Sequence, residues 1–288
     1  MTPRARTKTR GHARNAGQSE DRSEDRSSKP AAGATARRGE MYFYGIIRWP
    51  LPSDENALGV GVGDPPRALR AVRLRSTAAL VSDVSAAEMS GQGLRGMRRD
   101  MKAHAAALNR IAAEMTVLPV RFGVVLPDDR ALISQFMTPQ YERLDAYLDH
   151  LEGAVEITLR ATSVEEQALR EVIAARPELA ASGGGRRGAS LANESRIEAG
   201  RQIAAAIQDL QDRDARWIVD ALAPMVRDLR IGKPLRDLMA LNASFLVDRS
   251  KLKKFDRVLE KLNAEAGHRI EFDCVGPLAP YSFVDLRL

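Results

Sequence analysis

The sequence contains a single cysteine, Cys274, among its 288 residues. One thiol cannot form an intramolecular disulfide, and it cannot build a metal site from clustered cysteines. Cysteine usage this sparse is typical of a reducing compartment. We therefore expect neither a redox function nor a cysteine-bound metal.

Long hydrophobic runs are also missing. No stretch approaches the roughly 20 consecutive apolar residues that span a bilayer. The first residues contain no apolar run that resembles the core of a secretory signal. We expect a soluble, cytoplasmic protein without membrane contact, and its 44% hydrophobic residues are enough for a sizeable core in one large domain or two ordinary ones.

Residues 1–40 lack valine, isoleucine, leucine, phenylalanine, tyrosine and tryptophan, and hold ten basic residues against five acidic ones. Such a segment cannot bury enough surface to offset the entropy of ordering, so we predict a disordered basic tail. The remainder is nearly neutral, with 34 basic and 33 acidic residues. It lacks the cationic excess of a nucleic-acid-binding domain, and nucleic acid is not expected as its partner.

Four patterns predict structure in the first part of the chain. An aromatic and β-branched run that begins at Met41 predicts a central strand. Residues Pro50–Pro66, rich in glycine and proline, predict a surface loop. The alternation in Ala71–Val84 predicts a hairpin that turns near Ser76, and Leu118–Leu126 predicts a further strand.

A three-four spacing of mostly apolar residues predicts a long helix between the hairpin and this further strand. The spacing places these residues on one face, which we expect to be buried. The face consists of Leu94, Met97, Met101, His104, Leu108, Ile111 and Met115.

The second half predicts a strand, helices and further strands. Thr138-Pro139 has the residues of a helix N-cap and first turn. Ser182–Gly188 predicts a connector within an extended helical insertion. If a weakly marked strand lies near Met225–Ile231, the order matches the β-α-β-β-α-β ferredoxin-like arrangement. We thus predict an α+β protein with an N-terminal α+β domain at 41–135 and a ferredoxin-like domain with a helical insertion at 136–275.

No pattern in the sequence signals catalysis. The four histidines stand apart, and neither a His-Glu-x-x-His zinc motif nor a Gly-x-Ser-x-Gly nucleophile elbow occurs. Gly59–Gly63 runs into prolines, and Gly183–Gly188 lacks the lysine and hydroxyl residue of a phosphate-binding loop. We therefore expect no catalytic residue, no metal and no cofactor.

Two segments have features that need an explanation. Leu118–Gly123 places the guanidinium of Arg121 in an apolar strand, where burial without an acceptor is costly. We expect Arg121, together with Phe122, to make a structural contact, and contact with a partner is the alternative. Gly276–Val284 is an apolar, proline-stiffened segment near the end of the chain. We expect residues 276–288 to dock through Tyr281 and Phe283, on the protein itself rather than on a partner.

Four segments in this order resemble the gas vesicle GvpF/GvpL family: Tyr42–Ile47, Leu118–Gly123, Leu241–Val247 and Gly276–Val284. The resemblance implies a two-domain α+β protein whose second domain is a modified ferredoxin-like fold with helical additions. It implies an accessory protein without known catalytic activity. Such proteins contact the small hydrophobic shell protein and other accessory proteins during nucleation or growth of the vesicle.

The leading hypothesis is therefore a non-catalytic adaptor or chaperone-like scaffold that is associated with gas vesicles. Two alternatives remain open at this point. A ferredoxin-like sheet can host an enzyme for a small, nucleotide-type substrate. The basic tail could instead bind nucleic acid through salt-dependent contacts.

Overall fold

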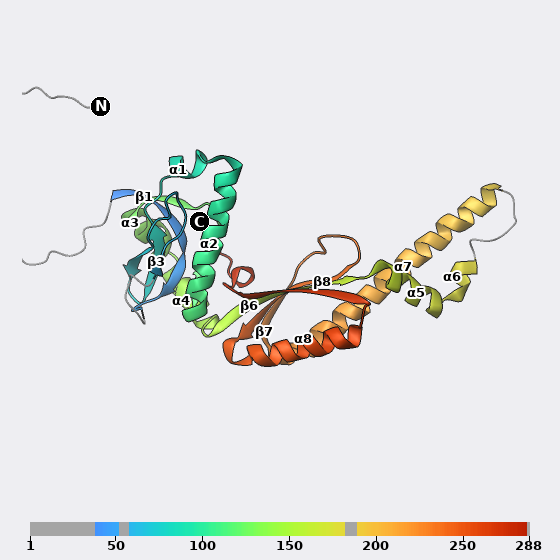
Figure 1. The fold of residues 1–288 in the computed structure, drawn as a ribbon. Helices are drawn as coiled ribbons and strands as arrows, with labels where there is room; N and C mark the ends of the chain where they lie inside the picture. The colour runs from blue at the N-terminus through green and yellow to red at the C-terminus, as the bar shows by residue number, and fades with distance from the viewer. Residues whose placement is uncertain (1–37, 52–57, 182–188, 287–288) are drawn as a thin grey trace, which may run out of the picture. The chain divides into compact units, whose positions relative to one another are not determined.

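Two antiparallel sheets and the helices around them form an α+β fold (Figure 1). The structure is a computed structural model that describes residues 38–51, 58–181 and 189–286. The predicted connector Ser182–Gly188 and nearly all of the predicted tail lie outside these ranges. The first strand begins at Arg38, before the predicted start at Met41.

The first sheet has the strand order β2-β3-β1-β4, with β5 also paired to β1. The central strand is confirmed, since both faces of β1 are buried. The hairpin is also confirmed, and its turn contains Arg75 with a φ of 53° beside Ser76. The strands are β1 (Arg38–Arg48), β2 (Arg70–Leu74), β3 (Thr77–Ser82), β4 (Val117–Pro119) and β5 (Val125–Asp128).

A β-bulge in β1 changes which residues face each side of this sheet. Phe43 and Ile46 belong to one core, whereas Tyr44 and Ile47 belong to the other. Alternate residues of a regular strand share a face, so this shift requires an irregularity. The register against β3 changes between Phe43 and Gly45, which accounts for it.

Helices cover the two faces of the first sheet. Leu108 of α2 packs in the core on the Tyr44 side, and Leu144 of α4 packs in the core on the Phe43 side. The predicted cap at Thr138 is wrong, because a π-helical turn runs to Met137 and α4 begins at Tyr141. The helices are α1 (Ala86–Ser90), α2 (Gly93–Glu114), α3 (Asp129–Ala131), η2 (Leu132–Met137) and α4 (Tyr141–His150).

The predicted buried face of α2 is only half correct. His104, Leu108 and Ile111 are buried. In contrast, Leu94, Met97 and Met101 are 71%, 43% and 48% exposed. The reason is a rotation of the inward face, since Gly96 and Asp100 are the buried residues in the first half of the helix. A spacing of 3.5 residues drifts around an α-helix of 3.6 residues per turn.

The predicted surface loop Pro50–Pro66 contributes to the core in its described part. Leu58 and Val62 are buried, and the Val62 N–H donates to the Tyr44 hydroxyl at 2.8 Å. This approach requires Gly61, because a Cβ there would collide with the Tyr44 phenol. Burial of the loop follows from this close contact.

The second sheet has the order β7-β8-β6-β9, and every neighbouring pair is antiparallel. The strand predicted near Met225–Ile231 is confirmed as β7. Phe245 of β8 packs against Phe255 of α8, with ring centroids 5.7 Å apart. The strands are β6 (Ala154–Ser163), β7 (Val226–Ile231), β8 (Met239–Asp248) and β9 (Ile270–Leu278).

The helices of the second half pack on one face of this sheet and beyond it. Figure 1 shows α7 extending past the sheet toward α5 and α6, where Leu210 and Val172 share a small separate core. The longer helices are α5 (Glu165–Ala175), α6 (Pro177–Ala181), α7 (Ala189–Leu222) and α8 (Leu252–Ala266). The 3-10 turns are η3 (Ala223–Met225), η4 (Arg249–Lys251) and η5 (Tyr281–Phe283).

Both sheets belong to one compact unit of the chain. Arg249 donates to the carbonyls of Ala112 and Ala113 near the end of α2. A cation at a helix C-terminus is stabilised by the helix dipole. Leu246 of β8 also belongs to a core of the first sheet. These contacts fix the region between the sheets. Gly276–Val284, the closing segment, lies in this region.

Candidate functional site

The closing segment turns back from β9 and is held by hydrogen bonds from two directions. The Ala279 N–H donates to Asn109 Oδ1 of α2 at 2.9 Å. Ser282 donates to the Glu156 carboxylate of β6 through its N–H at 2.8 Å and its hydroxyl at 2.6 Å. The segment is thus fixed between the two sheets.

Phe283 anchors the same segment by burial. Its side chain is 5% exposed and belongs to the core that contains Phe43 of the first sheet and Leu246 of the second. Tyr281 is half-buried and packs against the opposite core, with its ring centroid 6.2 Å from that of His104. The structure therefore places both predicted anchor residues on the protein's own body.

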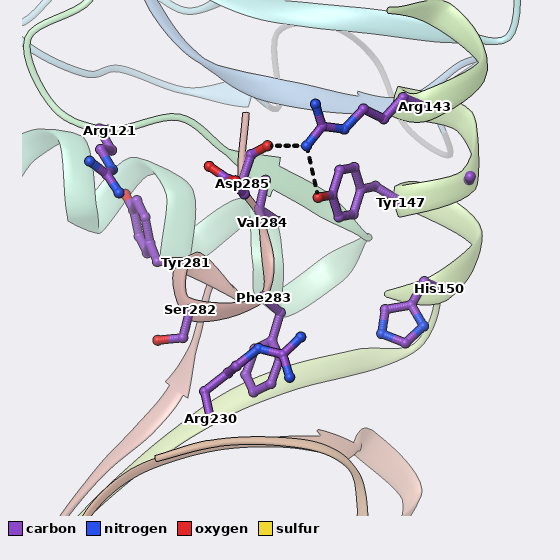
Figure 2. Close-up of a pocket in the computed structure, with 11 residues that line it drawn as sticks. Arg121, Arg143, Tyr147, His150, Arg230, Tyr281, Ser282, Phe283, Val284 and Asp285 are labelled. Atoms are coloured by element: carbon purple, nitrogen blue, oxygen red, sulfur yellow. Dashed lines mark hydrogen bonds between the residues drawn. The ribbon is translucent and has the colours of Figure 1, made fainter. Parts of the chain in front are cut away.

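A cavity of about 670 Å³ opens beside this segment (Figure 2). Figure 2 shows Arg121 and Tyr281 on one side of it and Arg143, Tyr147 and His150 of α4 on the other. The lining residues are Arg121, Arg143, Ala146, Tyr147, His150, Arg230 and Tyr281–Asp285. The lining contains three arginines but only one carboxylate, that of Asp285, so it has an excess of positive charge.

Two of the three arginines have partners. Arg143 donates to the Asp285 carbonyl at 2.7 Å and to the Tyr147 hydroxyl at 3.3 Å. Arg230 donates to Asp228 at 2.9 Å, and its guanidinium lies 5.6 Å from the centre of the Phe283 ring. These contacts orient both side chains along the cavity.

The third arginine, Arg121, corrects a prediction. Leu118–Leu126 is not one strand, because β4 ends at Pro119, β5 starts at Val125, and Arg121 directly precedes a turn at Phe122 and Gly123. Gly123 has a φ of 98°, which a strand does not allow. Arg121 is therefore exposed, and its guanidinium has no hydrogen bond or ion pair with any residue that the structure describes. Among the described residues, the predicted structural contact of Arg121 is absent.

The remaining predicted residue, Phe122, does not line the cavity. It is half-buried, and its ring centroid lies 5.8 Å from that of His104 and 6.0 Å from that of Tyr42. The Gly123 N–H donates to the Tyr42 hydroxyl at 3.0 Å. Phe122 and Gly123 therefore anchor the turn that presents Arg121.

Tyr281 offers a second free polar group. Burial raises the pKa of its hydroxyl, and the negative charge of Glu156 raises it further. The group thus keeps its proton at neutral pH. Within the described ranges, no residue forms a hydrogen bond with this hydroxyl. It can therefore donate to a ligand in the cavity.

Sequence reasoning missed the residues that α4 and β7 contribute. Arg143, Tyr147 and His150 follow a helical spacing, on the side of α4 away from buried Leu144 and Leu148. That spacing could have identified a shared face. Nothing in the sequence showed that Arg230 of β7 would lie near them.

The cavity combines hydrogen-bond donors with aromatic surface. Arginine and tyrosine donors suit carboxylates or other oxygen acceptors, and the rings of Tyr147 and Phe283 suit apolar groups. In the described part of the chain, no cluster of three or more metal-ligating side chains occurs. Within the same residues, no helix has the length and apolar character that crossing a membrane requires.

The family model, the relative and the solved structures that match this chain are all described as gas vesicle proteins. The family model described as gas vesicle synthesis protein GvpL/GvpF matches residues 40–285. The chain is 37% identical to a gas vesicle protein F from Streptomyces sp. (strain CB03234) over 255 residues, which covers 85% of this chain and 99% of that protein.

Two solved structures share the fold. The crystal structure of the gas vesicle protein GvpF from Anabaena sp. PCC7120 aligns with a TM-score of 0.74 at 20% identity, covering 87% of this chain and all of the other. The crystal structure of GvpF from Microcystis aeruginosa aligns with a TM-score of 0.68 at 22% identity, covering 85% of this chain and 98% of the other.

Proposed function

Because the chain belongs to the gas vesicle synthesis protein GvpL/GvpF family and so has a role in gas vesicle formation, we propose that it acts there as a non-catalytic adaptor. In this proposal it binds the hydrophobic shell protein and other accessory proteins during nucleation or growth of the vesicle. It acts in the cytoplasm, in association with gas vesicles.

One structural observation supports partner binding. The free guanidinium of Arg121 lies beside the free hydroxyl of Tyr281 in a cavity of about 670 Å³. Donors that no described residue occupies can bind an incoming chain without first breaking internal contacts. The aromatic surface beside them can receive an apolar side chain. A segment with both acceptor and apolar groups, as a protein partner offers, fits this lining.

Co-purification with the shell protein is the direct test. We expect the full chain to retain the shell protein, and we expect Arg121→Ala to weaken retention without a change in thermal unfolding, since Arg121 is exposed. Arg130→Ala serves as a matched control, because Arg130 is another exposed arginine and lies outside the cavity. If the unaltered chain retains no vesicle component, and vesicles form normally without its gene, the adaptor function is wrong.

We also propose that β6–β9 with their helices form a modified ferredoxin-like domain with a helical insertion. The element order and the strand order β7-β8-β6-β9 support this. The division into 41–135, 136–275 and a docked segment at 276–288 remains part of the same proposal. Limited proteolysis tests the boundary between 41–135 and 136–275, which should be cut before the strands of either sheet. First cuts inside β6 or β8 would contradict the division.

A further inference from the structure

The first half of α2 presents apolar side chains that the fold leaves uncovered. Leu94, Met97 and Met101 are 71%, 43% and 48% exposed. Their spacing of three and then four residues continues through His104, Leu108 and Ile111, which are buried. The same face of one helix is therefore covered in its second half and open in its first.

A second row of residues runs beside this apolar row. Arg95, Arg98 and Lys102 follow the same three-four spacing, one position later in the sequence. All three are exposed, and none has a hydrogen bond or ion pair with a residue in the described ranges. Their neighbour Arg99 differs, because it pairs with Asp100 at 3.1 Å. The open half of α2 thus carries a free cationic row alongside an apolar one.

We propose that this surface, defined by Leu94, Arg95, Met97, Arg98, Met101 and Lys102, docks an amphipathic helix of a partner protein with an apolar seam and acidic flanks. A seam with three-four spacing is the pattern by which two helices pack side by side. Charges beside such a seam select the partner, and three free cations select acidic residues. The unbranched methionines adapt to the side chains of a partner.

Two other occupants fit the same surface less well. A second copy would bring its own Arg95, Arg98 and Lys102 against the first set, and like charges repel. An anionic lipid surface would attract the cations, but interfacial helices use a broad apolar face that often includes tryptophan or phenylalanine. The row on α2 is narrow, and its exposed members are one leucine and two methionines.

The inference deepens the proposed adaptor function, on which it rests, by naming the chemistry of one partner. It concerns a surface separate from the cavity, since none of its residues lines that cavity. The two ideas can therefore fail separately. If the unaltered chain retains the shell protein but does not bind an acidic helical peptide, only this inference is rejected and the adaptor function stands.

The test uses the full chain and a synthetic helical peptide with leucine at the seam positions and glutamate on both flanks. A twin peptide carries lysine in place of every glutamate. Fluorescence anisotropy measures both affinities. We expect the acidic peptide to bind at least about tenfold more tightly than the basic one, with a preference that weakens as salt rises.

A charge-reversal variant gives the sharpest result. Combining Arg95→Glu, Arg98→Glu and Lys102→Glu should invert the preference, so that the basic peptide binds more tightly. The matched control combines Lys253→Glu, Lys254→Glu and Arg257→Glu, which changes the net charge equally on exposed positions of α8. This control should keep the preference for the acidic peptide. An equal loss in both variants would show an effect of net charge alone and would overturn the proposal.

Removal of the apolar row completes the test. Met97→Ser with Met101→Ser should weaken binding of the acidic peptide by about tenfold, while thermal unfolding stays unchanged because both side chains are exposed. No preference for the acidic peptide in the unaltered chain would overturn the proposal. So would α2-dependent binding to anionic lipid vesicles, or a dimer in sedimentation that the double variant dissociates.

Discussion

Ser282 gives both its backbone N–H and its hydroxyl to the carboxylate of Glu156, at 2.8 and 2.6 Å. Glu156 is 4% exposed and lies on β6 of the second sheet. The carboxylate thus fixes the closing segment in the position that forms one wall of the cavity. This buried acceptor therefore acts together with Asn109 and the burial of Phe283 to hold the wall in place.

Glu156→Ala should lower the free energy of unfolding by about 1–3 kcal/mol, because the Ser282 N–H loses its acceptor and the Ser282 hydroxyl keeps only Ser244 Oγ, at 2.9 Å. Glu156→Gln should cost much less. Its amide oxygen can accept from the Ser282 N–H, and its NH₂ can donate to the Ser282 hydroxyl. Urea unfolding of the three proteins measures the differences.

The comparison separates hydrogen bonding from charge. Equal losses for Glu156→Ala and Glu156→Gln would show that the negative charge, rather than acceptor geometry, holds the segment. Glu260→Ala on α8 is the control for removing an exposed carboxylate. It should change the free energy of unfolding by less than about 0.5 kcal/mol.

His104 is buried beneath the turn that presents Arg121 and is held in its neutral form. Its Nε2 donates to the Val120 carbonyl at 3.1 Å, since a carbonyl can only accept. Its Nδ1 then accepts from the Tyr42 hydroxyl at 3.0 Å. Burial lowers the pKa of His104 from its ordinary 6.5 to about 4.

This lowered pKa predicts that the protein loses stability as the pH is lowered from about 6.5 to about 4. The unfolded chain takes up the histidine proton below about pH 6.5, whereas the folded chain takes it up only near pH 4. Neutral His104 therefore favours the folded state above this window, and its contribution is lost as the pH falls through it. The difference corresponds to roughly 3 kcal/mol. Unfolding free energies measured by urea at pH 7 and pH 4.5 should show most of it.

A histidine replacement isolates this contribution from that of the carboxylates. His104→Gln should reduce the difference in unfolding free energy between the two pH values, even though it lowers stability at pH 7. His268→Gln removes an exposed histidine and should leave the difference as it is. An unchanged difference in the His104 variant would contradict the prediction.

Local patterns were sufficient to predict several single strands and a hairpin. The aromatic run at Met41 identified the central strand, because few other segments are apolar on both faces. The alternation around Ser76 identified the hairpin for the same local reason. Even the weak signal near Met225–Ile231 corresponds to a strand, β7.

The site could not be predicted in the same way, because it depends on distant packing. Arg121 was placed in a strand, but β4 and β5 pair one after the other along β1 in different registers, so the residues between them loop out of the sheet. Met97 was placed in the core, but Asp100 takes the inward position on α2. Apolar periodicity shows which residues share a face, and only tertiary structure shows what covers that face.

Two glycines should respond to alanine in opposite directions. Gly200 lies inside α7 in open space, so Gly200→Ala should raise the free energy of unfolding by about 0.5–1 kcal/mol through helix propensity.

Gly45 lies where β1 approaches β4, and an added Cβ would collide with the Leu118 carbonyl. Gly45→Ala should therefore lower the free energy by about 2 kcal/mol or more. Thermal and urea unfolding check both signs, and stabilisation by Gly45→Ala would reject the close approach.

Phe283 should contribute more to stability than any other side chain of the closing segment, because it is buried in a core that contains residues of both sheets. Phe283→Ala should cost about 3–5 kcal/mol, the usual range for a buried phenylalanine. Phe283→Leu should cost much less, since it leaves a smaller cavity. Leu235→Ala is the control for an exposed apolar side chain, at 68% exposure, and should be nearly neutral. A small loss in Phe283→Ala would mean that the hydrogen bonds to Glu156, rather than apolar burial, hold the segment in place.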